Sequence, residues 1–292
     1  MIKTISKAFE LLRDNIIIIQ PLIFYLLILG VISRPISFEG NFTLDSVFAI
    51  IISVLLTVAF LSGWFYITKL AISLKDKVYE SIEEKNLAQL SLLKQFFTGV
   101  GEYFIPVLFA FLLYTVVFIS FSYFAYKFGI EHIGKLVLTP DLVKALNTGS
   151  SKDLIKLLNS PESYQSIKLM AYWGFYISGL GLIFSFLTMY YGPAIVYDTK
   201  NPIKALFINL KFLFSNFMGS IFILLFLTFL NMLLSLFNVL SAMNIIFSVI
   251  SLLLMFLYMG YHVVLIFLYY DEKTQSNSNR GPERIGEIEP GN

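Results

Sequence analysis

Hydrophobic residues along the chain gather into six long runs, separated by segments in which charged and polar residues return. A helix needs about 20 apolar residues to cross a hydrocarbon core roughly 30 Å thick. No run alternates with period two, as the strands of a membrane barrel would. We therefore predict an all-α polytopic transmembrane bundle within an integral membrane domain over residues 1–271. Its six spans are expected at residues 16–33, 46–66, 103–128, 170–196, 217–237 and 244–270.

Composition supports a membrane class and excludes several others. Of the 292 residues, 57% are hydrophobic and only 14% are charged, against about 25% charged in an average soluble domain. A soluble core of that apolarity could not be covered by its own polar surface, and no nucleic-acid partner is expected. The chain has no cysteine, so disulfides, thiolate metal ligands and cysteine nucleophiles are excluded. No metal or cofactor site is predicted.

The distribution of Lys and Arg predicts the topology. With the N-terminus inside, fourteen of these residues fall on the inner side and seven on the outer side, which together make the 21 in the chain. Cytoplasmic loops carry the excess of positive charge. The first run is longer than a signal-peptide core and is followed by Ser33-Arg34-Pro35 rather than a small-residue cleavage site,. We expect a multi-pass protein of the cytoplasmic membrane of a prokaryote, with both termini cytoplasmic.

Three inner segments have the pattern of amphipathic helices, at residues 2–14, 87–97 and 203–214, each just before a predicted span. In the third, apolar residues recur at i, i+3, i+4, i+7, i+10 and i+11 from Ile203, and Lys204 and Lys211 lie on the opposite side,. Such helices typically lie in the membrane interface with lysines near anionic headgroups. The alternative is that they cap the bundle from below.

The remaining segments are predicted to lie outside the membrane. The outer loop over 129–166 is too long for a structureless connection and contains two short helical patterns, at 141–147 and 152–158. Residues 272–292, rich in Ser, Asn, Gly, Pro and Glu, predict a disordered cytoplasmic tail,.

The interfacial segments suggest an internal repeat. Asn15 and Asn216 each end an amphipathic pattern immediately before a span, whereas the second segment reads Thr98-Gly99 at that place. The exits also correspond, with Tyr197-Asp198 after the fourth span and Tyr270-Asp271 after the sixth. One interpretation is three parallel copies of an interfacial helix followed by a transmembrane hairpin. The other is the ordinary alternation of apolar runs and basic helices in any polytopic protein.

At these residues the chain resembles a broad family of prokaryotic six-helix membrane proteins. The resemblance rests on the basic amphipathic helix that ends in Asn, on the run from Tyr191 to Asp198, and on the run from Asn201 to Leu206. That family is similar to the membrane domain fused to some glycerophosphoryl diester phosphodiesterases. The resemblance implies a fold and a membrane location over residues 1–272. It implies no active-site residue, because the soluble catalytic domain has no counterpart here.

One titratable side chain, His262, lies inside a predicted span, and no Asp, Glu, Lys or Arg lies in the middle of one. Buried ionisable groups are costly in hydrocarbon and are default functional candidates. Ser248, Ser251, Tyr258 and His262 share one face of the sixth span, which we call the polar seam, and Asn231 and Asn238 lie on the fifth. The seam could line a cavity, or it could be a neutral packing surface between helices.

Two functional hypotheses follow. The first is a non-enzymatic accessory, scaffold or membrane-organising protein that binds lipid or an apolar molecule, with membrane lipids as partners and other membrane proteins or a homo-oligomer as further candidates. The second is a small-molecule transporter or channel whose route follows the polar seam around His262. An enzyme is least favoured, since no acid–base pair can be assembled from residues within the spans.

Overall fold

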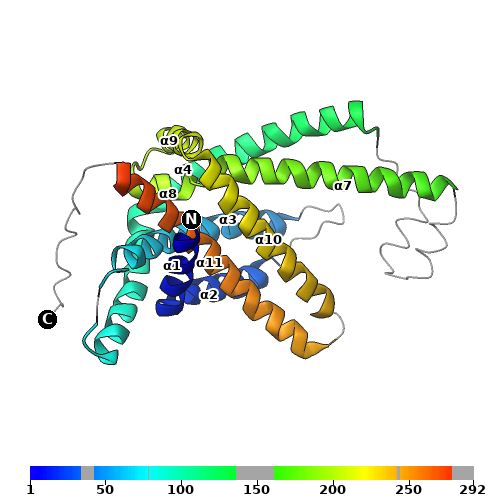
Figure 1. Cartoon of the computed structure of the whole chain (residues 1–292). Coiled ribbons are helices and arrows are strands. Elements are labelled where there is room, and N and C mark those ends of the chain that lie inside the picture. The colour runs from blue at the N-terminus through cyan, green and yellow to red at the C-terminus, as the bar shows by residue number, and fades with distance from the viewer. Residues whose placement is uncertain (34–42, 78, 136–160, 242–243, 278–292) are drawn as a thin grey trace. The chain divides into compact units, whose positions relative to one another are not determined.

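The fold is all-helical. In the computed structural model, the residues described are 1–33, 43–77, 79–135, 161–241 and 244–277, and these contain no strand. The sequence-predicted helices at 141–147 and 152–158 lie outside the described residues. Figure 1 shows the elements in chain order. They are α1 (Ile2–Asp14), the 3₁₀ helix η1 (Ile16–Ile19), α2 (Gln20–Ile32), α3 (Leu44–Ser73), α4 (Ile82–His132), α7 (Pro161–Thr188), α8 (Tyr191–Tyr197), α9 (Pro202–Ser215), α10 (Phe217–Ser241) and α11 (Ile245–Asn277).

The polytopic membrane class predicted from the sequence is confirmed. Among the described residues, five helical stretches are long and apolar enough to cross a membrane: Leu44–Ser73, Ile82–His132, Tyr164–Tyr197, Phe217–Leu240 and Ile245–Gln275. A sixth is added if the bent pair formed by Ile2–Asp14 and Ile16–Ile32 counts as one span. Because the two halves of that pair meet at 82°, α1 does not continue the direction of α2. The first span therefore depends on η1 and α2 alone.

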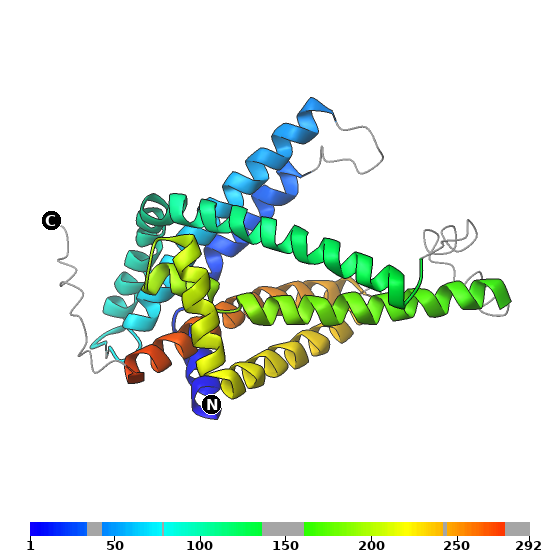
Figure 2. The same ribbon diagram turned by 90° about the horizontal axis from the view of Figure 1, so that it is seen from above.

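The chain divides into two compact units, Met1–Phe111 with Met189–Asn292, and Leu112–Thr188. In the first unit, α2 pairs with α3 and α10 with α11, while α1 packs along α11. Figure 2 shows these two hairpins diverging from the end at which α9 lies. Buried side chains concentrate at that end: most of those on α3 lie between Val58 and Ile72, and most of those on α11 lie between Tyr261 and Asp271. The opposite halves of the helices leave apolar side chains exposed, as lipid-facing surfaces do.

In the second unit, the end of α4 pairs with α7. Phe184 of α7 lies against the rings of Tyr114, Phe118 and Phe121 at centroid distances of 5.1, 5.2 and 5.5 Å. Further along, the Tyr176 hydroxyl donates to the Ala125 carbonyl at 2.9 Å. This pair covers most of the third and fourth spans expected from the sequence, but the fourth is interrupted after Thr188, and its last residues form α8 in the first unit.

Asparagine ends both α1 and α9, as the sequence pattern predicts. Asn15 has φ −126° and ψ 48°, and Asn216 has φ −121° and ψ 33°, so each leaves helical geometry in nearly the same way. The side-chain nitrogen of each donates at 3.0 Å to the carbonyl four residues earlier, Leu11 or Phe212. We call each arrangement an asparagine corner. The first and third copies of the proposed repeat therefore share a local structure.

The second copy differs from the prediction. The segment 87–97 and the span 103–128 lie in one continuous helix, α4. The chain has no asparagine at the corresponding place, and Thr98-Gly99 provides no side chain that folds back in this way. Gly99 instead allows a close approach, because a Cβ there would lie 2.5 Å from the Cβ of Tyr66.

The predicted boundary of the tail is also wrong by several residues. Helix α11 continues to Asn277, because Glu272 is held by α1: it accepts a hydrogen bond from Thr4 at 2.9 Å and pairs with Lys7 at 3.7 Å. These contacts place α1 beside the end of α11. The rest of the predicted tail, 278–292, lies outside the described residues.

Candidate functional site

The polar seam is described in the structure, and two of its members join α11 to α10. The Ser251 hydroxyl donates to the Asn238 side chain, and the Tyr258 hydroxyl donates to the Leu227 carbonyl at 3.2 Å. Ser251 is buried and Tyr258 is half-buried. Hydrogen bonds of this kind satisfy polar groups between packed membrane helices.

The other predicted site residues are more dispersed. Ser248 is exposed, and its hydroxyl donates to the Asn244 carbonyl one turn earlier at 3.4 Å. Asn231 is exposed on α10, and its backbone carbonyl accepts from Ser235. His262 is half-buried and meets the Tyr258 ring edge-on at a centroid distance of 5.8 Å. In the structure, Ser251 contacts Asn238 and Tyr258 contacts His262. The six predicted residues do not form one site.

A different group of charged residues converges at the buried end of the first unit, which we call the charged end. Lys75, just after α3, pairs with Asp271 of α11 at 2.9 Å, and Lys85 of α4 pairs with Asp14 of α1 at 3.0 Å. The Lys7–Glu272 pair joins α1 to α11 at the same end. These pairs join segments up to 265 positions apart in the sequence. Their three lysines all belong to the set that the topology prediction assigned to the inner side.

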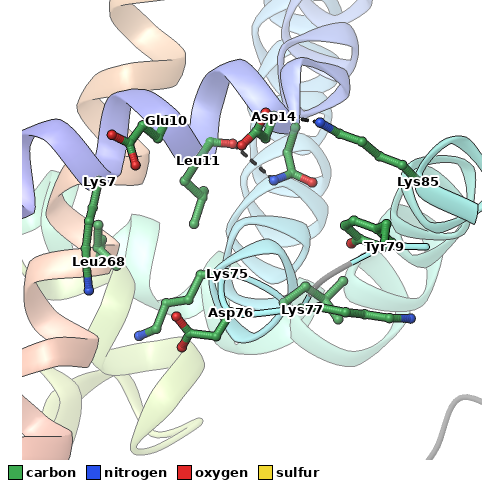
Figure 3. A pocket seen from close by; sticks show the side chains of 12 residues that line it. Lys7, Glu10, Leu11, Asp14, Lys75, Asp76, Lys77, Tyr79, Lys85 and Leu268 are labelled. Atoms are coloured by element: carbon green, nitrogen blue, oxygen red, sulfur yellow. Dashed lines mark hydrogen bonds and ion pairs between the residues drawn. The ribbon is translucent and has the colours of Figure 1, made fainter. Parts of the chain in front are cut away.

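Between these pairs lies a cleft of about 270 Å³, which we call the charged cleft. Its floor includes Leu11, Leu74 and Leu268, and its rim carries four lysines and three carboxylates. Figure 3 shows the Lys7 and Lys75 ammonium groups on the same side as the Asp76 carboxylate, with Leu11 pointing inward. The lining residues are Lys7, Glu10, Leu11, Asp14, Asn15, Leu74, Lys75, Asp76, Lys77, Tyr79, Lys85 and Leu268.

The ion pairs around the charged cleft differ in strength. The Lys75–Asp271 pair is the most enclosed, with side-chain exposures of 19% and 9%, and Asp271 also accepts from Gln275 at 2.8 Å. The Lys7–Glu272 pair is longer, at 3.7 Å, and the Lys7 side chain is 55% exposed. Because exposed pairs contribute little and break easily, Lys7 can turn toward a ligand, whereas Lys75 is fixed.

A tyrosine-rich core supports the charged end. Tyr190 is fully buried, its hydroxyl donates to Ser220 at 3.0 Å, and its backbone N–H donates to the Asn209 side chain at 2.9 Å. These bonds link the start of α8 to α9 and α10. Tyr270 donates to Asp198, and Lys69 donates to the Val196 carbonyl at 2.9 Å. Lys69 therefore faces protein at the end of α8, where a lysine near a span end would otherwise reach for the surface.

Sequence reasoning did not identify the charged cleft or this core. One available signal was Asn209, a polar residue on the inward face of α9 between buried Ala205 and Leu213. A buried amide in that position must be hydrogen-bonded, and its partner is Tyr190. The cleft itself has no local signal, since its residues come from α1, the segment 74–79, α4 and α11.

Within the described ranges, no group of three or more His, Cys, Asp or Glu side chains is arranged to hold a metal ion. Comparison of the chain with protein-family models, with curated proteins and with solved structures found no match. The resemblance to the phosphodiesterase-associated membrane domain therefore stays a prediction.

Proposed function

We propose that the protein is a non-enzymatic, membrane-organising protein that binds phospholipid at its charged end through α1 and α9. The observation that carries this proposal is the asparagine corner, which ends both helices just before a membrane helix. Each helix buries one face on the bundle and leaves another uncovered. On α9, Ala205, Asn209 and Leu213 are buried, while Phe207 and Phe214 are exposed.

The exposed faces have the composition that the membrane interface selects. Phe9 on α1 is 61% exposed, and Phe207 on α9 is 68% exposed. Lys204 and Lys211 are exposed on the same helix. Aromatic side chains directed toward acyl chains, with lysines near phosphates, are typical of helices that lie in the interface. The exposed faces of these helices fit a location in the membrane interface, and their buried faces fit helices that cap the bundle.

We also propose a location and an orientation. The excess of Lys and Arg in the segments joined at the charged end favours the cytoplasmic side for that end. The membrane is then the cytoplasmic membrane of a prokaryote, with the N-terminus and the C-terminal tail both inside. Other membrane proteins, or a second copy of the chain, are compatible partners for the exposed apolar helix faces.

The lipid proposal is tested by lipid retention. The full chain is placed in nanodiscs of mixed phosphatidylglycerol and phosphatidylcholine, and native mass spectrometry counts the lipids that stay bound. We expect retention of the anionic lipid, reduced by the double variant Lys204→Gln/Lys211→Gln. Since a lysine near an anionic surface contributes about 1 kcal/mol, the reduction should not exceed roughly thirty-fold.

The matched control removes two lysines from the second unit, as Lys127→Gln/Lys168→Gln. Each of these lysines lies over a neighbouring tyrosine ring, Tyr123 or Tyr172. Retention by this control should equal that of the parent chain. If both double variants lose anionic lipid equally, or if the parent prefers neither lipid, the proposal is wrong.

The alternative function, a small-molecule transporter or channel, depends on the polar seam. Ser251 and Tyr258 both donate hydrogen bonds to α10, which favours a packing role for the seam. The alternative is tested by replacing His262 with Phe in proteoliposomes. A solute flux that this change abolishes, without loss of the folded protein, would favour transport over the membrane-organising role.

A further inference from the structure

We propose that the charged cleft binds a zwitterion composed of a primary ammonium and a phosphate, the phosphoethanolamine group. This inference rests on the proposed function, because a phospholipid headgroup is the form in which a membrane offers that group. Free phosphoethanolamine esters present the same chemistry from solution. The cleft supplies both signs of charge over an apolar floor, and each has a place in recognition.

The ammonium group of the ligand is expected to contact the carboxylates on the rim that lack a cation. Among the described residues, each of the four lysines on the rim has a carboxylate partner: Lys7 has Glu272, Lys75 has Asp271, Lys77 has Glu84, and Lys85 has Asp14. By contrast, Asp76 has no ion pair or hydrogen bond there, and Glu10 accepts only a weak hydrogen bond from Ser6 at 3.4 Å. The rim therefore has negative charge to spare, which a small cation would neutralise.

The phosphate group of the ligand is expected to contact Lys7 and Lys75. Figure 3 draws both ammonium groups on the side of the cleft that also carries the Asp76 carboxylate, and neither forms an ion pair with it among the described residues. The long, exposed Lys7–Glu272 pair leaves Lys7 available, while Asp271 holds Lys75 in place. An anion and a cation joined by two carbons can then contact neighbouring groups of opposite charge. A purely anionic ligand would place its charge beside Asp76 and Glu10, which is unfavourable.

The volume of the cleft suits a small ligand such as a lipid headgroup. Its volume of about 270 Å³ is below the roughly 300–1,000 Å³ of pockets that enclose drug-sized ligands. Leu11, Leu74 and Leu268 line the floor, so the carbons next to the phosphate meet apolar side chains. The acyl chains would stay in the membrane beside α1.

Competition between two zwitterionic lipids tests the proposal. The full chain is reconstituted in nanodiscs of equal phosphatidylethanolamine and phosphatidylcholine, which share the phosphate and differ in the N–H donors of the amine. Native mass spectrometry should show preferential retention of phosphatidylethanolamine. We expect Glu10→Gln/Asp76→Asn to reduce that preference about tenfold, as loss of charged hydrogen bonds predicts. The conservative variant Asp76→Glu should keep it.

Glu83→Gln is the matched control, because Glu83 is exposed on α4 and does not line the cleft. A preference unchanged in Glu10→Gln/Asp76→Asn, or equally reduced in the control, would overturn the proposal. So would a parent chain that retains both lipids equally. Failure of the proposed function is distinct, since it is measured in the phosphatidylglycerol and phosphatidylcholine nanodiscs, where the parent chain would then prefer neither lipid. Displacement of the bound lipid by soluble glycerophosphoethanolamine would show that the zwitterion alone suffices, and retention in its presence would assign the site to the intact lipid.

Discussion

Gly63 on α3 and Gly99 on α4 each meet an aromatic ring of the other helix. A Cβ on Gly63 would lie 2.6 Å from the Phe96 ring, and a Cβ on Gly99 would lie 2.5 Å from the Cβ of Tyr66. The second contact is with the root of a side chain, which cannot move without its backbone. We expect Gly99→Ala to destabilise the protein by about 1–3 kcal/mol through overpacking. Thermal unfolding in detergent measures the effect.

Gly101 is the control for this prediction. It lies on the same helix two residues away, and a Cβ there would meet nothing within 4 Å. Gly101→Ala should therefore be neutral or stabilising by up to about 1 kcal/mol, since alanine favours helix over glycine. Equal melting temperatures for the two variants would show that the close approach at Gly99 does not constrain packing.

The asparagine corner gives a second prediction at the residue scale. Asn216→Ala removes the hydrogen bond to the Phe212 carbonyl and should cost about 1 kcal/mol. Asn15→Ala should cost a similar amount, because it removes the equivalent bond to Leu11. Ser215→Ala, next in the chain and exposed, should leave the melting temperature unchanged. A large loss for only one asparagine would argue against equivalent corners.

At the scale of elements, the Lys75–Asp271 pair joins the end of α3 to the end of α11. Asp271→Asn would leave the Lys75 ammonium enclosed without a counter-charge, and we expect a loss of about 2 kcal/mol or more. The more exposed Lys77–Glu84 pair gives the comparison, and Glu84→Gln should have a much smaller effect on unfolding. The double variant Lys75→Met/Asp271→Leu should recover part of the loss, since it leaves no unpaired charge. The prediction fails if Asp271→Asn and Glu84→Gln unfold alike.

The elements were largely predictable from the sequence because helix formation in a membrane depends on local composition. Helices α10 and α11 begin within one residue of the predicted starts of their spans. Asn15 and Asn216 end their helices as expected. The continuity of α4 was not predicted, since the basic amphipathic pattern of 87–97 matched segments that do end. The segments that end have an asparagine where the second segment has Thr98-Gly99. Gly99 also lies against Tyr66 of the neighbouring helix α3, a contact that the local sequence does not reveal.

The candidate site was much less predictable. Lys75 and Asp271 are 196 positions apart, and each reads in the sequence as an ordinary charge flanking a span. Their convergence requires knowledge of which helix ends meet. The same holds for Tyr190 and Asn209, whose hydrogen bond forms only once α8 and α9 are folded together. Intramembrane polarity drew attention to His262 instead, because a single-sequence argument detects an unusual residue more readily than a distant contact.

At the scale of the whole molecule, the decisive prediction is which membrane face carries the charged end. Because the chain has no cysteine, each introduced thiol is the sole target of a membrane-impermeant maleimide. Ser6→Cys on α1 and Lys273→Cys on α11 lie at the two ends joined by the Lys7–Glu272 pair, so they must be labelled from the same side whatever the orientation. The orientation that we propose from the excess of Lys and Arg makes that side the cytoplasmic one. Both should therefore react in inverted vesicles and stay unreacted in intact cells.

Ala145→Cys, in the predicted outer loop, should show the reverse. Labelling of Ser6→Cys in intact cells would invert the topology and move the charged cleft to the outer face, whereas opposite labelling of Ser6→Cys and Lys273→Cys would contradict the packing of α1 against α11.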